Sequence, residues 1–127
     1  MLSINRLQQQ YMKYGLEIKG ILSDPNPDYE SLFRIVDENM SNISFEYDTT
    51  LEIAKHHGIT TTPQVILFDS LSNIIYTGQV DNYYYSFGKH RSSASKNYLE
   101  NAIVATLSGD IPEIKMTKPI GCRINFH

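Results

Sequence analysis

Apolar residues recur at helical spacing near the start of the chain, and an alternating segment follows them. Leu7, Tyr11 and Tyr14 are separated by polar residues, which is the spacing of one face of an α-helix. Gly15 comes next as a helix stop, so the pattern predicts a helix that ends there. Residues 16–22 alternate apolar and polar before becoming apolar, which is typical of a strand with one buried end.

The next part of the chain repeats this alternation of helix and strand. Residues 29–40 regain the helical period after a proline-containing loop and predict a second helix. Residues 44–47 form a short candidate strand. Thr49 is followed three residues later by Glu52, which is the spacing of a capping box, so we expect Thr49 to open a helix over residues 50–57.

Two β-rich runs, residues 64–68 and 73–77, stand on either side of a short polar linker. A linker of this length is suited to a hairpin, so the pattern predicts an antiparallel pair. Residues 81–91 are aromatic and basic, fit no clean period and predict a long loop.

A last helix is expected from the apolar face of residues 99–107, with Ser95 as its cap and Gly109 at its end. Residues 111–127 form an extended tail. The order of elements is that of an α/β fold, in which the first two strands need helical crossovers and the last two make a hairpin. The chain opens with a crossover helix that has no strand before it.

Composition fits one folded domain. The 127 residues are 41% hydrophobic and 20% charged, close to the averages of globular proteins. A net charge of -3 argues against nucleic acid as a partner, because phosphate binding needs clustered Lys and Arg. No run approaches the ~20 apolar residues of a membrane span, and no export signal opens the chain. The localisation stays open, since a signal upstream of Met1 would lie outside this sequence.

Candidate metal chemistry is sparse. Cys122 is the single cysteine, so neither an intramolecular disulfide nor a cysteine-rich zinc site is possible. His56 and His57 are adjacent and point in different directions on a helix, so they do not have the spacing of paired metal ligands. We expect them to stabilise the helix C-terminus, and we predict neither a metal site nor a cofactor.

Several segments together resemble a bacterial redoxin group in the thioredoxin-like superfamily, related to the peroxiredoxins and the thiol-disulfide oxidoreductases. The segments are Ile59-Thr-Thr-Thr-Pro-Gln-Val-Ile-Leu-Phe-Asp69, residues 73–82, the Gly88–Arg91 loop and Lys118-Pro-Ile-Gly-Cys-Arg123. The resemblance implies a three-layer α/β/α fold with a mixed sheet and a C-terminal antiparallel hairpin. On this interpretation residues 1–110 form an incomplete thioredoxin-like domain, and residues 111–127 form its tail.

The resemblance also implies a site. Pro63 is expected to be a cis-proline after Thr62, and the two residues would shape the approach of a substrate. Arg91 either holds a substrate carboxylate or is a solvated loop charge. Cys122 either acts as a second or resolving thiol, or is a cysteine of the tail without a role.

One part of the family pattern is missing. Thioredoxin-like enzymes carry a reactive cysteine at the start of their first helix, where the helix dipole lowers the thiol pKa. Here that region reads Met1-Leu-Ser-Ile-Asn5, and the strand that should precede it is also absent. We therefore expect a chain truncated at its N-terminus and inactive as a thiol-dependent reductase or peroxidase. A non-catalytic module that binds an extended peptide is the alternative, and pairing of the open sheet with another copy is a third hypothesis.

Overall fold

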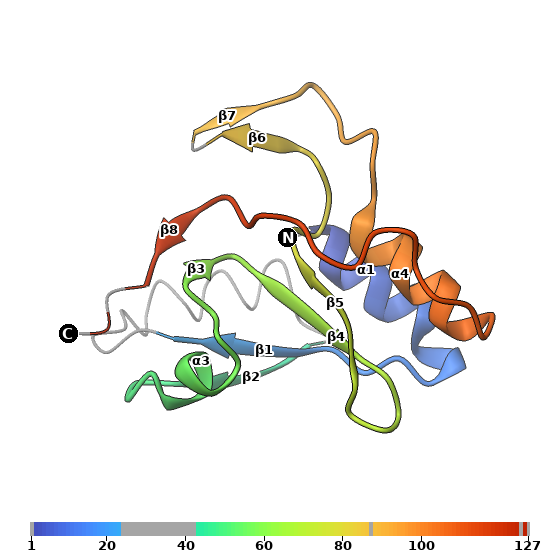
Figure 1. Cartoon of the computed structure of the whole chain (residues 1–127), viewed down its shortest axis with the longest axis horizontal. Helices are drawn as coiled ribbons and strands as arrows, with labels where there is room; N and C mark the ends of the chain where they lie inside the picture. Colours follow the sequence, from blue (N-terminus) through green and yellow to red (C-terminus); the bar gives the residue numbers. More distant parts are fainter. Residues whose placement is uncertain (1, 24–42, 87, 125, 127) are drawn as a thin grey trace. The chain divides into compact units, whose positions relative to one another are not determined.

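The computed structural model describes residues 2–23, 43–86, 88–124 and 126 (Figure 1). The chain forms two compact units. The first, residues 1–60 with 124–127, is called the N-terminal unit below, and the second, residues 61–123, is called the hairpin unit. The helix expected over residues 29–40 lies outside the described residues.

The first helix of the N-terminal unit ends at the glycine that the sequence indicates. Helix α1 spans Leu2–Tyr11 and continues into the short 3-10 helix η1, Met12–Tyr14. Gly15 has a φ of 96°, a left-handed conformation that a residue without a Cβ adopts at little cost. The buried Gln8 then holds the chain that leaves the helix, since its Oε1 accepts a hydrogen bond of 2.8 Å from the Ile18 N–H.

The parallel pair expected from the element order is present. Strand β1, Lys19–Leu22, pairs in parallel with β2, Ser44–Tyr47, and Lys19 lies opposite Ser44. Parallel neighbours need a crossover connection, and residues 23–43 supply its length. Both strands alternate between exposed and half-buried residues, so one face of the pair is covered.

The expected capping box is wrong, and a carboxylate takes its place. Helix α3 spans only Glu52–His56, and the residue before it, Leu51, makes no side-chain cap bond. Asp48 provides the cap, since its carboxylate accepts hydrogen bonds from the N–H groups of Ile53 (3.1 Å) and Ala54 (3.0 Å). A carboxylate at this end also suits the helix dipole, which explains why Asp48 prevails over the neighbouring threonine.

The predicted hairpin is confirmed in the hairpin unit. Strands β4, Val65–Phe68, and β5, Ile74–Gly78, pair antiparallel. Asp69 organises the turn, because its Oδ1 accepts hydrogen bonds from the N–H groups of Leu71 and Asn73, each at 2.9 Å. The buried apolar residues of this unit include Tyr76, Leu99, Ala102 and Ile103.

The expected long loop over residues 81–91 is wrong in part. It contains a second antiparallel hairpin of β6, Tyr84–Ser86, and β7, Lys89–His90, which Figure 1 shows standing away from α4. The strands are short and entirely exposed, so they leave no apolar period in the sequence that would have indicated them.

The last helix is present, but its expected cap is not. Helix α4 spans Tyr98–Leu107 and contacts both β4 and β5. Ser95 lies before the helix and bonds Asn82 instead, through its N–H (2.8 Å) and its hydroxyl (2.9 Å). Gly109 follows the helix with a φ of 77°, as the pattern of a helix stop predicts.

The extended tail returns to the hairpin unit. Met116 forms a parallel bridge with Thr77 at the edge of β5, and strand β8, Cys122–Arg123, pairs with β3, Thr61–Thr62. The division of the chain into a domain of residues 1–110 and a tail of residues 111–127 stays a prediction. Helices and strands together make an α/β fold with both parallel and antiparallel pairs.

Candidate functional site

The short ribbon of β3 and β8 brings three of the four expected site residues together. In its antiparallel register Thr62 lies directly opposite Cys122, and Thr61 lies opposite Arg123. Directly opposed residues of an antiparallel pair have their side chains on the same face, so the Cys122 thiol shares a face with the Thr62 side chain. The Thr62–Pro63 peptide bond is cis, as expected, and places Pro63 next to the paired residue.

The site is open to solvent. Thr62, Pro63 and Cys122 are all exposed, and Cys122 is a free thiol. An exposed thiol opposite a polar side chain is accessible to a disulfide or peroxide from outside. The arrangement therefore has the access that thiol exchange requires.

Gly121 sets how closely β8 approaches β3. A Cβ at Gly121 would collide with the Thr62 carbonyl group and would lie 3.0 Å from Cδ of Pro63. A glycine is therefore required for the tail to pass against the Thr62–Pro63 bond at this distance. This contact, together with the pairing of β8 with β3, fixes the position of Cys122 relative to Thr62.

A second contact, here called the tail contact, holds the tail further upstream and consists of Tyr76, Gln79 and Thr117. The Tyr76 hydroxyl donates to the Gln79 carbonyl (2.6 Å) and shares a hydrogen bond with Thr117 Oγ1 (2.6 Å), which also accepts from the Gln79 N–H (2.9 Å). Burial raises the pKa of the Tyr76 hydroxyl above its usual range, and the nearby Tyr98 adds to this, although the bonds to Thr117 and Gln79 oppose it. Tyr76 therefore stays a neutral donor far into the alkaline range.

Arg91, the fourth expected residue, follows β7 in the other hairpin. Its Nε donates to the Asn82 carbonyl (3.0 Å), and its guanidinium lies 5.4 Å from the ring centroid of Tyr85. These contacts give Arg91 a structural role in the β6–β7 hairpin. Whether it also holds a substrate carboxylate stays a prediction.

The adjacent histidines lie at the C-terminal end of α3. Both His56 and His57 are exposed, and their rings meet edge to face with centroids 4.8 Å apart. Within the part of the chain that is described, no group of three His, Cys, Asp or Glu side chains is placed to hold a metal ion.

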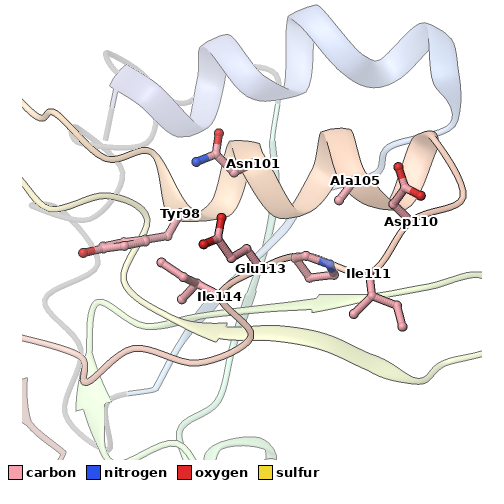
Figure 2. Close-up of a pocket in the computed structure, with 8 residues that line it drawn as sticks. Tyr98, Asn101, Ala105, Asp110, Ile111, Glu113 and Ile114 are labelled. Atoms are coloured by element: carbon pink, nitrogen blue, oxygen red, sulfur yellow. The ribbon is translucent and has the colours of Figure 1, made fainter.

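A separate hollow of about 480 Å³ lies between α4 and the chain that follows it (Figure 2). Its polar lining includes the carboxylates of Asp110 and Glu113 and the side chains of Tyr98 and Asn101. None of the expected site residues lines it. The hollow is thus a second feature of the hairpin unit, distinct from the ribbon that bears the thiol.

Sequence reasoning missed the residues that position the site. Thr117 and Gly121 lie in the segment predicted to be an extended tail, and Asn82 lies in the segment predicted to be a loop; the resemblance covers Gly121 and Asn82 but assigns them no role. The adjacency of Gly121 to Cys122 was a usable signal, because a glycine beside a candidate functional residue often marks a close approach of two backbones.

Comparison with known proteins shows the fold. The sequence matches no protein-family model and no curated protein. It is similar to the crystal structure of an uncharacterized conserved protein from Geobacillus kaustophilus, with a TM-score of 0.84 and 26% identity over 99% of this chain and 68% of that protein. A hypothetical protein from Sinorhizobium meliloti matches with a TM-score of 0.83 and 24% identity, over 99% of this chain and 70% of that protein.

These similarities place the chain in an α/β fold that is found in at least two bacterial proteins. Neither protein is described by an activity. Among the described residues, no helix has both the length and the apolar character that crossing a bilayer requires. Function therefore has to be argued from the site itself.

Proposed function

We propose that this chain is a thioredoxin-like redoxin module, related to the thiol-disulfide oxidoreductases and peroxiredoxins, and that, with no cysteine at the start of α1, it does not turn over a disulfide or a peroxide by itself. Its substrate, a protein disulfide or a peroxide, would approach the face shared by Thr62, Pro63 and Cys122. The observation that carries the proposal is the pairing of Thr62 with Cys122 across β3 and β8. The parallel β1–β2 pair and the antiparallel β4–β5 hairpin support the finer assignment to a three-layer thioredoxin-like fold.

The chemistry open to a single thiol is one half of an exchange cycle. The Cys122 thiolate attacks one sulfur of a substrate disulfide, so a mixed disulfide forms and the other sulfur leaves as a thiolate. A thiolate from another molecule then attacks the Cys122 sulfur, so the reduced substrate leaves and Cys122 is joined to the donor in a new mixed disulfide. A second donor thiolate attacks the donor sulfur of that bond and releases Cys122 as a thiolate. Since this sequence holds one cysteine, both donor thiols come from outside it, and their oxidation to a disulfide supplies the two electrons.

With a peroxide, the same thiolate attacks one oxygen of the O–O bond. Cys122 becomes a sulfenic acid, and the other oxygen leaves as an alkoxide or hydroxide that takes up a proton. An external thiol then condenses with the sulfenic acid and releases water, which gives a mixed disulfide between Cys122 and the donor that a second donor thiol reduces. Both routes therefore need a thiol donor from outside the chain.

The proposal is tested by following exchange at Cys122 with two substrates of different size. Oxidised glutathione serves as the small disulfide, and an extended peptide that contains a disulfide serves as the large one. We expect Thr62→Leu, which adds bulk directly opposite the thiol, to slow exchange with the peptide several-fold more than exchange with glutathione. Thr49→Leu, at an exposed threonine of the N-terminal unit, is the matched control and should change neither rate.

Equal slowing of both disulfides by Thr62→Leu, or no slowing at all, would sink the proposal, because the face around Thr62 would then not meet the substrate. Catalytic reduction of insulin is a second readout. With no other thiol present, the chain should form at most one mixed disulfide per molecule with insulin and should release no reduced insulin. Turnover beyond one equivalent that disappears in Cys122→Ser would show that no external thiol is needed and would overturn the mechanism described above.

A non-catalytic peptide-binding module is the second candidate. The observation that favours it is the exposure of Thr62, Pro63 and Arg123 around a single thiol. This candidate predicts stoichiometric binding of a cysteine-free extended peptide that is unchanged in Cys122→Ser. Loss of peptide binding in that variant would exclude it and favour the redox function.

A further inference from the structure

We propose that the β6–β7 hairpin is a docking surface for an acidic, extended segment of a partner protein. The surface, here called the basic hairpin, is made by Tyr84, Tyr85, Lys89, His90 and Arg91 together with Lys96, and all six residues are exposed. None of these residues belongs to the β3–β8 ribbon, and only Arg91 is also a candidate for binding a substrate of the thiol chemistry proposed above.

Charge is the first argument. The whole chain has a net charge of -3, yet from Asp81 to Glu100 the sequence contains no other acidic residue. Lys89, Arg91 and Lys96 fall within that stretch and give it a local positive charge against an acidic background. A positive patch on an otherwise acidic chain attracts a carboxylate-rich segment. The acidic remainder of the chain repels that segment, so the segment should bind at the positive patch.

The aromatic rings decide which kind of acidic partner fits. Tyr83 and His90 are stacked on one another, with ring centroids 4.8 Å apart and planes 9° apart. The Arg91 guanidinium lies over the Tyr85 ring. One face of each of these rings is thus already covered, so each ring offers a ligand its remaining face, its edges and its polar atoms.

Nucleic acids are a poor match to this arrangement, because single strands bind aromatic platforms along a continuous positive groove, and the sequence from Asp81 to Glu100 holds only three Lys or Arg side chains. Carboxylates, by contrast, accept hydrogen bonds from ammonium, guanidinium and hydroxyl donors alike. A segment rich in Asp or Glu therefore fits the available donors better than stacked bases do.

The hairpin is also held in place before any ligand arrives. Asn82 is buried, and its Oδ1 accepts hydrogen bonds from the N–H groups of Ser95 (2.8 Å) and Lys96 (2.9 Å), so it ties together the two ends of the excursion. Its main chain adds two bonds, an N–H donated to the Lys96 carbonyl (3.0 Å) and a carbonyl that accepts from Arg91 Nε. A surface that is fixed in this way loses less conformational entropy on binding.

The test uses the full chain, uniformly labelled with ¹⁵N, and a fluorescein-labelled oligoglutamate peptide as the probe. We expect the peptide to shift the backbone amide signals of the basic hairpin and to bind less tightly as salt is raised. The double variant Lys89→Glu and Lys96→Glu should weaken binding about tenfold, which corresponds to ~1.4 kcal/mol. The matched control is Lys115→Glu with Lys118→Glu, which makes the same change in net charge at exposed lysines outside the hairpin and should leave binding within about twofold.

A second variant keeps the test decisive if charge reversal disturbs the hairpin. Tyr85→Ser removes an exposed ring. It should weaken binding of the peptide several-fold and leave the backbone amide signals of α4 unchanged. Equal weakening by the control pair, or peptide-induced shifts outside the hairpin only, would overturn the proposal. Tighter binding of a short single-stranded oligothymidylate than of the peptide would also overturn it, since the partner would then be a nucleic acid.

Discussion

Each of the two compact units contains a buried polar group with several hydrogen bonds, and the two groups differ in charge. In the N-terminal unit the group is the Asp48 carboxylate, which is 3% exposed, and in the hairpin unit it is the Tyr76 hydroxyl, on a residue that is 0% exposed. Asp48 receives hydrogen bonds from the Ile53 and Ala54 N–H groups and from the Ser23 hydroxyl (2.9 Å). Tyr76 bonds Gln79 and Thr117.

The comparison shows two ways in which a polar group can be buried in this chain, one for a charged group and one for a neutral group. Burial of Asp48 opposes its ionisation, but hydrogen bonds from Ala54, Ile53 and Ser23 outweigh that effect and lower the pKa of its carboxyl below the usual value. For Tyr76 the neutral hydroxyl is already the favoured form, and burial raises its pKa. A charged buried group needs several donors, whereas a neutral one is satisfied by two partners. Asp48 should therefore make the N-terminal unit lose stability in acid, whereas Tyr76 should make the hairpin unit lose stability only in strong base.

The largest effect is expected on removing the Tyr76 ring. Tyr76→Ala leaves a cavity in the buried part of the hairpin unit and should lower the free energy of unfolding by about 3–5 kcal/mol, as for other buried aromatic residues. Tyr76→Phe keeps the ring and loses only the hydroxyl, so it should cost about 1–2 kcal/mol. Urea denaturation measures both. Equal costs for the two variants would mean that the hydroxyl, and not the ring, supports the unit.

Asp48→Ala is expected to come next. It removes the cap of α3 and leaves the Ser23 hydroxyl without its partner, which should cost about 2 kcal/mol. Urea denaturation again gives the value. The control is Asp110→Ala, an exposed carboxylate beyond α4, which should change stability by no more than ~0.5 kcal/mol. A cost for Asp48→Ala as small as that of the control would show that the carboxylate does not hold the helix.

The dependence of stability on pH should be smaller, since protonation leaves the Asp48 side chain in place. The folded pKa lies below that of the unfolded chain, which is about 3.9, so the stabilisation is fully present above that pH. It is lost as the pH falls through the folded pKa. Unfolding measured between pH 7 and pH 2 should therefore show a loss at the acid end that is reduced in Asp48→Ala. Parallel curves for the two proteins would assign the acid sensitivity to other groups.

The smallest effect is expected at Cys122, which is exposed and pairs with Thr62 only through its main chain. Cys122→Ser should change the free energy of unfolding by no more than ~0.5 kcal/mol. A substantially larger loss would identify the thiol as part of the packing and would weaken its assignment as a reactive group. Thermal unfolding of the two proteins under reducing conditions makes the comparison.

The sequence was informative where one element carried its own period. Helix α1 with its stop at Gly15, strand β2 and the β4–β5 hairpin all follow from local patterns of apolar residues and turn residues. The sequence was misleading where a residue bonds a partner far along the chain, and where a neighbouring residue competes for the same capping role. Asp48 caps α3 in place of Thr49. Ser95 does not cap α4, because it bonds Asn82 on the other side of the β6–β7 hairpin.

The candidate site was predicted in part. Thr62, Pro63 and Cys122 were named from a family resemblance, and the register of β3 with β8 brings them together. The pairing itself was not predictable from local patterns, because β3 and β8 are two residues long and far apart in the sequence. For Arg91 the sequence leaves two roles open, a partner of a substrate carboxylate and a solvated loop charge. Its contacts with Asn82 and Tyr85 were not predictable, because they depend on a hairpin that left no periodic signal.

The two close contacts of the tail limit where residues can be inserted into or deleted from this chain. Thr117 is fixed at Gly78, where a Cβ would collide with Thr117, and Gly121 is fixed at Thr62. Only residues 118–120 connect these two points, so they act as a spacer of set length. An inserted or deleted residue there would release one contact or the other and move the thiol along β3. Variation in chain length should accordingly be accepted in the exposed turn at Leu71 and rejected between Thr117 and Gly121.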